Sequence, residues 1–204
     1  MDRETIASYE ANAGEIFNRH ISHGRDRMNQ RILAWFHPAA LTADIGSGSG
    51  IMLNWLLEQG YDTVGYEPVA ALRQMSQEHY PAITVHNDGL PDLATIPDAT
   101  YANVLSSAVL MHLPAESVEA SLRAFVRITA PGGRLLISWR HGTDGAEREP
   151  DGRLFTPIEL TEAAAILQSA GATIHDLTVE EDISRPGVQW SILTASKQDN
   201  TKMP

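Results

Sequence analysis

Apolar residues follow two patterns along the chain, a spacing of three or four that is typical of helices and short continuous runs that are typical of buried strands. The helical spacing predicts helices at 3–20, 25–36, 50–59, 69–79, 115–129 and 157–170. The apolar runs predict strands at 41–45, 62–66, 82–86, 101–106, 134–139, 172–181 and 188–196. Two helices therefore precede the first strand, and strands then alternate with helices until a final hairpin.

The last predicted helix has a clear start signal. Thr156-Pro157-Ile158-Glu159 has the threonine and glutamate of a capping box, in which each side chain bonds a free backbone N–H, and a proline at the first helical position. We therefore expect this helix to begin at Pro157 and to end at Gly171.

The alternation of strands and helices favours a parallel sheet with helices on both faces, because parallel strands need a crossover connection. The final hairpin, with a turn at Ser184-Arg185-Pro186-Gly187, adds an antiparallel strand. Ligands of such sheets bind outside the carboxyl ends of the strands. Functional residues are therefore expected in the loops that follow strands.

Composition narrows the class of protein. The chain has 204 residues, a length that favours one domain with a single core. Its 15 Lys+Arg against 26 Asp+Glu leave a formal charge of −11. Phosphate backbones require a basic face, so nucleic acid is not an expected partner. The absence of cysteine excludes disulfides, thiolate zinc sites, iron–sulfur clusters and cysteine nucleophiles.

Neither a membrane-spanning helix nor a signal peptide is expected from the sequence. No stretch approaches the roughly 18 apolar residues that a membrane helix needs, and the start is charged and polar, unlike a signal peptide. We therefore expect a cytoplasmic protein without membrane contact. No heptad repeat or apolar stripe marks an interface, so both a monomer and a homodimer fit the sequence.

A glycine-rich loop follows the first predicted strand and opens the next helix. Asp44-Ile45-Gly46-Ser47-Gly48-Ser49-Gly50 allows a tight turn and close approach of a ligand to the backbone at a helix N-terminus. Glu67 ends the next strand 21 residues after Gly46, where a carboxylate can accept hydrogen bonds from ribose hydroxyls. The dinucleotide pattern G-x-G-x-x-G needs glycine where Ile51 stands, so NAD is disfavoured. Loop and acid together predict a nucleoside site.

The loop resembles the signature D/E-x-G-x-G-x-G of the class I S-adenosylmethionine (SAM)-dependent methyltransferases, residue by residue from Asp44 to Gly50. Later segments similar to that family follow in the same order, at 86–91, 105–113 and 127–137, the last with Thr129 where leucine is more usual. The resemblance implies an α/β, Rossmann-like sheet of seven mostly parallel strands in the order 3-2-1-4-5-7-6, with an antiparallel last strand.

The resemblance covers nearly the whole chain and implies its organisation and activity. We expect one methyltransferase domain at 1–196, with an N-terminal helical cap over the active site at 1–37, a core at 41–196 and a flexible tail at 197–204. The implied activity is methyl transfer (EC 2.1.1.-), with SAM as the cofactor and S-adenosylhomocysteine (SAH) as the product.

The resemblance also assigns residues to the cofactor. Asp88 stands where an acid of the family meets the adenine amino group. Tyr9 stands where a tyrosine closes over SAM, although a core aromatic would have the same helical spacing. The implied cofactor-binding residues are Tyr9, Asp44, Gly46, Ser47, Gly48, Gly50, Glu67, Pro68, Asp88, Gly89, Leu90, Ser106, Ser107 and Ala108.

Methyl transfer is an in-line displacement at a sulfonium methyl, so positioning and the exclusion of water are the main requirements. A hydroxyl acceptor is helped by a base that removes its proton, and histidine is suited to neutral pH. His112 follows the fourth strand, in the segment that the resemblance places near the reacting methyl group. It is the candidate catalytic residue, with a structural hydrogen-bond donor as the alternative.

Substrate contacts are expected from the two N-terminal helices, from the loop after the fifth strand and from the final hairpin. That loop has about 17 residues, more than compact domains usually have. Its arginines offer two-pronged donors for a carboxylate or phosphate, with pairing to nearby acids as the alternative. Trp139 is either a pocket wall or a core residue. The candidate substrate residues are His20, Trp139, Arg140, His141, Arg153 and Arg185.

No metal site is expected, because the helix breaks between His20 and His23 and no acid pattern joins them. Related enzymes that methylate base amino groups or glutamine carry Asn/Asp-Pro-Pro-Tyr/Phe after the fourth strand, where this chain has Ser106-Ser107-Ala108-Val109. A small-molecule acceptor is therefore preferred, with O, N and C nucleophiles left open. The alternatives are a protein or tRNA methyltransferase, a non-catalytic SAM-binding partner subunit and a nicotinamide-dependent oxidoreductase.

Overall fold

The computed structural model describes residues 1–22, 26–141, 147–182, 185 and 187–199. Within them the helices are α1 (Arg3–Ala11), α2 (Ala13–Ser22), α3 (Asp26–Trp35), α4 (Ile51–Glu58), α5 (Ala70–His79), the 3₁₀ helix η1 (Leu110–His112), α6 (Ala115–Ile128) and α7 (Leu160–Ser169). The strands are β1 (Leu41–Ile45), β2 (Asp62–Tyr66), β3 (Val85–His86), β4 (Tyr101–Ser107), β5 (Thr129–Arg140), β6 (Ala172–Glu181) and β7 (Gln189–Lys197).

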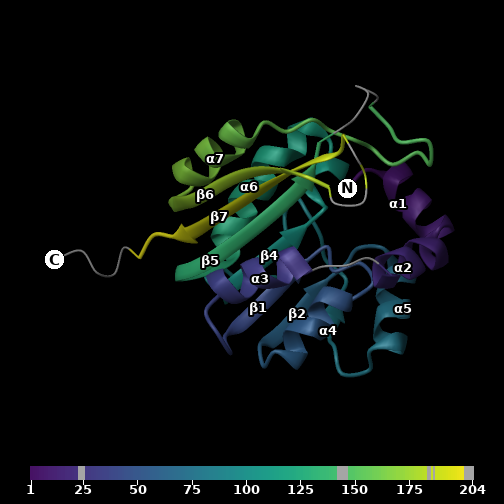
Figure 1. The fold of residues 1–204 in the computed structure, drawn as a ribbon, viewed down its shortest axis with the longest axis horizontal. Helices are drawn as coiled ribbons and strands as arrows, with labels where there is room; N and C mark the ends of the chain where they lie inside the picture. Colours follow the sequence, from purple (N-terminus) through teal and green to yellow (C-terminus); the bar gives the residue numbers. More distant parts are fainter. Residues whose placement is uncertain (23–25, 142–146, 183–184, 186, 200–204) are drawn as a thin grey trace.

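These strands form one sheet in the order β3-β2-β1-β4-β5-β7-β6. Neighbours from β3 to β5 are parallel, whereas β7 pairs antiparallel with both β5 and β6. The sheet crosses the centre of the molecule in Figure 1, and the C-terminal end of β7 points away from the N-terminal helices. The fold class and the strand order implied by the resemblance are confirmed.

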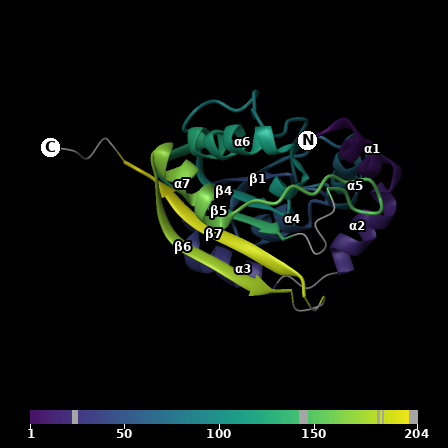
Figure 2. The same cartoon turned by 90° about the horizontal axis from the view of Figure 1, so that it is seen from above.

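Helices cover both faces of the sheet. Helices α6 and α7 pack on one face and α3 and α4 on the other, and Figure 2 shows α6 and α3 on opposite sides of the strands. Helices α1 and α2 pack against α5, at the end of the molecule that lies opposite the C-terminus in both views. Among the helices of the described ranges, none has both the length and the apolar character to cross a membrane.

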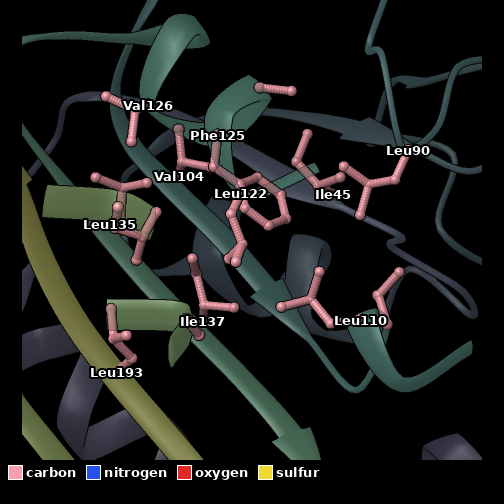
Figure 3. Close-up of a cluster of buried hydrophobic side chains, with 14 of the residues drawn as sticks. Ile45, Leu90, Val104, Leu110, Leu122, Phe125, Val126, Leu135, Ile137 and Leu193 are labelled. Atoms are coloured by element: carbon pink, nitrogen blue, oxygen red, sulfur yellow. The ribbon is translucent and has the colours of Figure 1, made fainter. Parts of the chain in front are cut away.

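The larger core lies between the sheet and α6. Leu135 and Ile137 of β5 point toward α6, where they lie near Leu122 and Phe125 (Figure 3). Leu136, between them in sequence, faces the smaller core beneath α3 and α4. All of these side chains are completely buried. Alternation along the strands therefore sends successive residues to different cores, as the pleat of a sheet requires.

The predicted helix at 3–20 is two helices. Asn12 is the C-cap of α1: its backbone N–H donates to the carbonyl oxygen of Ser8 at 3.0 Å, and its side-chain amide donates to the same oxygen at 2.8 Å. The backbone leaves the helical path at Asn12, with φ −112° and ψ 15°, and α2 begins at Ala13. The prediction of one continuous helix is wrong because the apolar spacing continues across this break.

The expected capping box does not form. The Thr156 hydroxyl donates to the carbonyl oxygen of Leu113 at 2.5 Å, and the Thr156 N–H donates to that of Met111 at 2.8 Å. These bonds hold the segment beside η1, and α7 begins at Leu160 instead of Pro157. The predicted helix start is wrong because a tertiary contact takes the threonine that the cap requires.

Two strands differ from the predicted length by more than one residue. Strand β3 is limited to Val85–His86. Strand β5 starts earlier than expected, because Thr129 pairs with Tyr101 before the chain bulges at 130–133 and pairs again from Arg134. Residues 130–133 therefore form a bulge within a strand that is longer than predicted.

A buried asparagine joins the segment after α3 to the sheet. Asn103 of β4 is completely buried. Its Oδ1 accepts the N–H of His37 at 2.9 Å, and its Nδ2 donates to the His37 carbonyl oxygen and the Thr42 hydroxyl at 2.9 and 3.0 Å. One side chain thus satisfies backbone groups where the chain passes from α3 to β1.

We expect Asn103→Ala to lower the free energy of unfolding by about 2–4 kcal/mol, because it removes these bonds and leaves backbone groups of His37 without partners. Chemical denaturation measures the change. Asn54→Ala is the matched control, since the Asn54 side chain donates to the exposed Glu58 on the same helix, α4, and a change within about 0.5 kcal/mol is expected there. Equal losses in the two variants would contradict the role given to Asn103.

Candidate functional site

A cavity of about 830 Å³ opens at the carboxyl ends of the central strands. The glycine loop after β1, helices α1 to α3, η1, the loop before α7 and the start of β7 contribute to its wall. Its volume lies in the range of sites that hold cofactors and small molecules. The cavity is where the topology of an open parallel sheet places a ligand.

The glycine loop lies tightly against its neighbours. Gly46 has φ +76°, and a Cβ there would lie 2.4 Å from a methyl carbon of Val109, so only glycine fits. Gly48 has φ +53°, and a Cβ there would approach the ring of His20 at 3.4 Å. The N–H groups of Gly46 and Ser47 donate to the carbonyl oxygen of Tyr66. The loop is thereby fixed to the end of β2.

Two buried carboxyl groups line this part of the cavity. Glu67 accepts the N–H of Gly48 at 2.8 Å through Oε2 and the N–H of Val69 at 2.9 Å through Oε1. Burial raises the pKa of Glu67 to about 7, although both backbone bonds oppose the rise. Burial also raises the pKa of Asp44 to about 7, and the charge of Glu67 adds to this effect. The two acids therefore favour a ligand that brings positive charge or hydrogen-bond donors.

Two hydroxyl groups at the same end are suited to a polar ligand. Ser47 and Ser49 line the cavity, and their buried hydroxyl oxygens have no hydrogen-bond partner among the described residues. Such groups are costly to bury unless a ligand or water satisfies them. SAM, which carries ribose hydroxyls, an amino group and a sulfonium charge, fits this set of donors and acids.

His112 in η1 faces the cavity in a fixed orientation. Its Nδ1 lies 2.7 Å from the carbonyl oxygen of Leu154, which can only accept, so Nδ1 carries the proton and Nε2 is left as an acceptor. Its ring meets that of Tyr9 edge to face, with the centroids 5.8 Å apart. Burial lowers the pKa of His112 to about 4, and the charges of Arg153 and Arg140 act in the same direction. The imidazole is therefore neutral at physiological pH.

Beyond the glycine loop, the floor of the cavity is formed by one face of the sheet. Ser107 of β4 pairs with Ser138 of β5 in the strand register, and their hydroxyl oxygens are 3.0 Å apart. Ser138 in turn pairs with Ile192 of β7, and Arg140 pairs with Trp190. Paired residues of neighbouring strands share a face, so these five side chains form one continuous surface.

Trp139 lies on the opposite face of the sheet. It stands between Ser138 and Arg140 in β5, and alternation turns it away from the cavity. Its indole N–H donates to the carbonyl oxygen of Ile158 at 3.1 Å, and the side chain is 1% exposed. Of the two positions considered for Trp139, the structure places it in the core.

Two arginines face the cavity beside His112. Arg140 and Arg153 both form ion pairs with Glu149. The Nε of Arg153 also pairs with Asp151 at 2.8 Å, and its Nη1 donates to the Tyr9 hydroxyl at 3.3 Å. The wall therefore contains charges of both signs, and the arginines are paired with acids of their own loop.

The cavity gathers many of the candidate residues from distant parts of the chain. Those that line it are Tyr9, His20, Asp44, Gly46, Ser47, Gly48, Glu67, Ser107, Ala108, His112, Arg140, Arg153 and Arg185. Those outside its lining are Gly50, Pro68, Asp88, Gly89, Leu90, Ser106, Trp139 and His141. His23 and the turn residues Ser184 and Pro186 lie outside the described residues.

Asp88 bonds its own loop. Its Oδ1 accepts the N–H of Gly89 at 2.7 Å, and its Oδ2 accepts the N–H and hydroxyl of Thr95 at 2.8 and 2.6 Å. Met1 lines the cavity and donates its amino group to the carbonyl oxygen of Leu90 at 3.2 Å. The chain start thus lies beside the segment that the resemblance assigns to adenine.

Two other candidates outside the lining have structural partners. The Ser106 hydroxyl donates to the carbonyl oxygen of Ile45 at 3.2 Å, between β4 and β1. The Nε2 of His141 lies 2.6 Å from the Ser191 hydroxyl oxygen of β7. Both side chains therefore connect neighbouring strands.

Sequence reasoning missed cavity residues on α3 and β7. Met28 and Arg31 line the cavity from α3, and Arg31 donates to Glu180 of β6 at 2.8 Å. Trp190 and Ile192 line it from β7. Their spacing of two indicates that Trp190 and Ile192 share a face, but the spacing does not tell which face holds the ligand.

The methyltransferase domain family matches residues 18–175 of the chain. The chain belongs to this family. Its domain is of the class I, SAM-dependent type, with SAM as the methyl donor.

Two uncharacterized methyltransferases are similar to the chain. One, from Oceanobacillus iheyensis, is 28% identical over 46% of this chain and 44% of its own length. The other, from Alkaliphilus oremlandii, is 26% identical over 67% of this chain and 61% of its own length. The chain thus spans less than two thirds of these relatives.

Solved structures share the fold of this methyltransferase domain. The 1,6-didemethyltoxoflavin-N1-methyltransferase of Burkholderia thailandensis, solved with 1,6-didemethyltoxoflavin and SAH, has a TM-score of 0.68 at 19% identity over 95% of this chain and 88% of that chain. The complex of the Haloferax volcanii Trm112 methyltransferase activator and a putative methyltransferase has a TM-score of 0.76 at 14% identity, over 97% of this chain and 99% of that chain. A putative sarcosine dimethylglycine methyltransferase from Galdieria sulphuraria has a TM-score of 0.65 at 13% identity, over 85% of this chain and 84% of that chain.

We expect the ligand-free methyltransferase to lose stability as the pH rises from about 5 to 7. Asp44 and Glu67 keep their protons up to about pH 7 when folded, whereas they ionise near pH 4 when unfolded. Since the folded state then binds more protons, the free energy of unfolding falls as pH rises. His112, neutral when folded and protonated below about pH 6.5 when unfolded, acts in the opposite direction. The two carboxyl groups change the free energy of unfolding with pH more than this single imidazole does.

Melting temperatures measured across this pH range test the expectation. Asp44→Asn and Glu67→Gln should each reduce the fall in stability, because each removes one of the two titrating acids. Asp62→Asn is the control, since Asp62 is exposed on β2. If both variants kept the pH profile of the unchanged protein, the raised pKa values would be contradicted.

Proposed function

We propose that the protein transfers a methyl group from SAM to a small-molecule acceptor. The observation that carries this proposal is one cavity with two chemically distinct regions. The region beneath the glycine loop has buried acids and two hydroxyls that find no partner in the described part of the chain, which suit the cofactor. The other extends over β4, β5 and β7 and combines apolar, hydroxyl and arginine side chains beside His112, which suits an acceptor.

The first region contains the groups that would hold SAM. Glu67 has one carboxylate oxygen on Gly48 and the other on Val69, and its remaining acceptor capacity is available to ribose hydroxyls. Asp44 and the hydroxyls of Ser47 and Ser49 offer further bonds on the same side. SAM, when bound, supplies a methyl group on a positively charged sulfur. Asp44 and Glu67, once ionised, would favour a positively charged ligand over a neutral one, because opposite charges attract in a buried site.

His112 is the group suited to remove a proton from the acceptor. Its Nδ1–H is committed to Leu154, so Nε2 is free of a proton, and the residue lines the cavity. A pKa of about 4 makes it a weak base, but one that is neutral and ready throughout the physiological range. Histidine in this state takes a proton that is already leaving during methyl transfer and does not have to form the free anion first.

Several observations support a small molecule as the acceptor. The formal charge of −11 disfavours RNA, and the acceptor region is part of a cavity of a size that suits small ligands. Two of the structurally similar proteins are named for small molecules, 1,6-didemethyltoxoflavin and sarcosine or dimethylglycine. The neighbour from the Trm112 complex keeps the alternative of a partner-activated enzyme open to test.

The cofactor is tested by thermal unfolding of the purified protein alone and with SAM, SAH and NAD in parallel. A ligand at about 100 times its dissociation constant adds about 2.7 kcal/mol. At this chain length that corresponds to a rise in melting temperature of roughly 5–11 °C. We expect the rise with SAM and SAH and none with NAD. A rise with NAD alone would overturn the proposal.

For the base, we expect His112→Gln to lower turnover by about 10²-fold or more, the usual contribution of a general base. Glutamine can still donate to the Leu154 carbonyl oxygen, so the fold and the affinity for SAH should be retained. Turnover is measured as SAH release with an acceptor found by screening small hydroxyl, amine and carboxyl compounds. His175→Gln, on the exposed surface of β6, is the control. Unchanged turnover in His112→Gln would leave His112 with a structural role only.

A further inference from the structure

In the acceptor region, two guanidinium groups share one carboxylate. Glu149 directs Oε1 to Arg140 and Oε2 to Arg153. All three side chains are largely buried, with 14%, 12% and 18% of Arg140, Arg153 and Glu149 exposed, and all three line the cavity. One carboxylate held between two arginines is the geometry in which proteins bind carboxylate ligands.

Aromatic rings hold both guanidinium groups in place. Arg140 lies over the ring of Phe155, with its central carbon 4.8 Å from the centroid, and Arg153 lies over Tyr9 at 5.3 Å. The Nε of Arg153 is fixed by Asp151. Because the arginines are held by groups other than Glu149, exchange of that carboxylate for another does not require them to move.

The charges around Arg140 favour an anion. Burial lowers the pKa of Arg140, and the positive charges of Arg185 and Arg153 are the next causes. Arg185 pairs with Asp182 and Arg153 with Asp151. For Arg140, Glu149 is the ion-pair partner in the described part of the chain. An anion must therefore remain beside Arg140 whenever Glu149 leaves.

We propose that the methyl acceptor is an organic anion whose carboxylate, or a similar group, binds between Arg140 and Arg153 in place of Glu149. This inference rests on the proposed function and names the substrate class for the same site. Met28, Met52 and Ile192 line the same cavity, so the acceptor combines the anionic group with an apolar body. Glu149 acts as an internal counter-ion when the acceptor is absent.

The position of Arg140 separates this subsite from the cofactor. The glycine loop follows β1 and Glu67 ends β2, whereas Arg140 is on β5, two strands from β1 on the other side of β4. Arg140 pairs across strands with Trp190 of β7, still farther from β1. Arg140 therefore faces the acceptor side of the cavity, and a carboxylate held there keeps the acceptor beside His112.

Anion binding can be measured before the acceptor is known. Isothermal titration calorimetry at constant ionic strength, on both the SAH-loaded and the ligand-free protein, would use acetate, benzoate, phenylacetate and inorganic phosphate as probes. Acetamide, benzamide and phenylacetamide are the neutral matches of the carboxylates. The variants are Arg140→Gln, Glu149→Gln and, as the control, Glu147→Gln, an exposed acid of the same loop.

We expect the carboxylates to bind and the amides to bind at least about tenfold more weakly, because truncating a buried charge pair costs that much or more. Glu149→Gln should tighten carboxylate binding by about tenfold or more, since it removes the internal competitor. Arg140→Gln should weaken it by a similar factor without changing the affinity for SAH, and Glu147→Gln should change neither.

Three results would overturn the inference. One is the absence of binding by every anionic probe in both the unchanged protein and Glu149→Gln. Another is equal binding of amides and carboxylates. A third is a loss of SAH affinity in Arg140→Gln, which would assign the arginine to the cofactor's own carboxylate. Failure of the unchanged protein to bind SAH would count against the proposed function instead, and the ligand-free titrations would still decide the subsite.

Discussion

The carboxylate of Glu67 connects the two strand ends on which the proposed cofactor site depends. One oxygen accepts the N–H of Gly48 in the loop after β1, and the other accepts the N–H of Val69 before α5. A buried acid that loses its donors is costly, so these bonds fix the loop and the end of β2 relative to each other. Asp44 adds a second buried acid, and both have raised pKa values without a ligand. The site thus carries unfavourable electrostatics that a positively charged ligand relieves.

The pleat of the sheet explains how one structure supplies both a core and an acceptor region. In β5, Ile137 and Trp139 face α6 and α7, while Ser138 and Arg140 face the cavity. The same alternation in β7 assigns Leu193 to the core and Ile192 to the other face. A shift of one residue in the pairing of β5 with β7 would exchange these roles. The register that stabilises the large core therefore also positions the acceptor floor.

The alternation of strands and helices could be predicted from apolar periodicity, whereas the strand order could be predicted only from the resemblance. The glycine loop and Glu67 could also be located, since their chemistry requires fixed spacing along the chain. Other features depend on contacts between distant segments. The sequence at Thr156 favours a cap, but Leu113 takes its hydroxyl. Trp139 fits both a wall and a core, and only the pairing of β5 with its neighbours decides between them. The orientation of α3, which brings Arg31 to Glu180, has no signal in local sequence.

Glu149 illustrates how an internal acid can set specificity while it preserves the fold. Without it, Arg140 would be a largely buried charge beside two other arginines, a costly arrangement. With Glu149 in place, an incoming ligand must replace one carboxylate by another. Only the difference in interaction free energy between the ligand's carboxylate and that of Glu149 then contributes to affinity. A neutral ligand that displaced Glu149 would leave Arg140 without its ion-pair partner, whereas Arg153 would keep Asp151, and such a ligand is therefore rejected. An anionic ligand replaces the ion pairs that Arg140 and Arg153 form with Glu149, and it releases Glu149 to solvent. The exchange therefore selects ligands by their charge and adds little to their affinity.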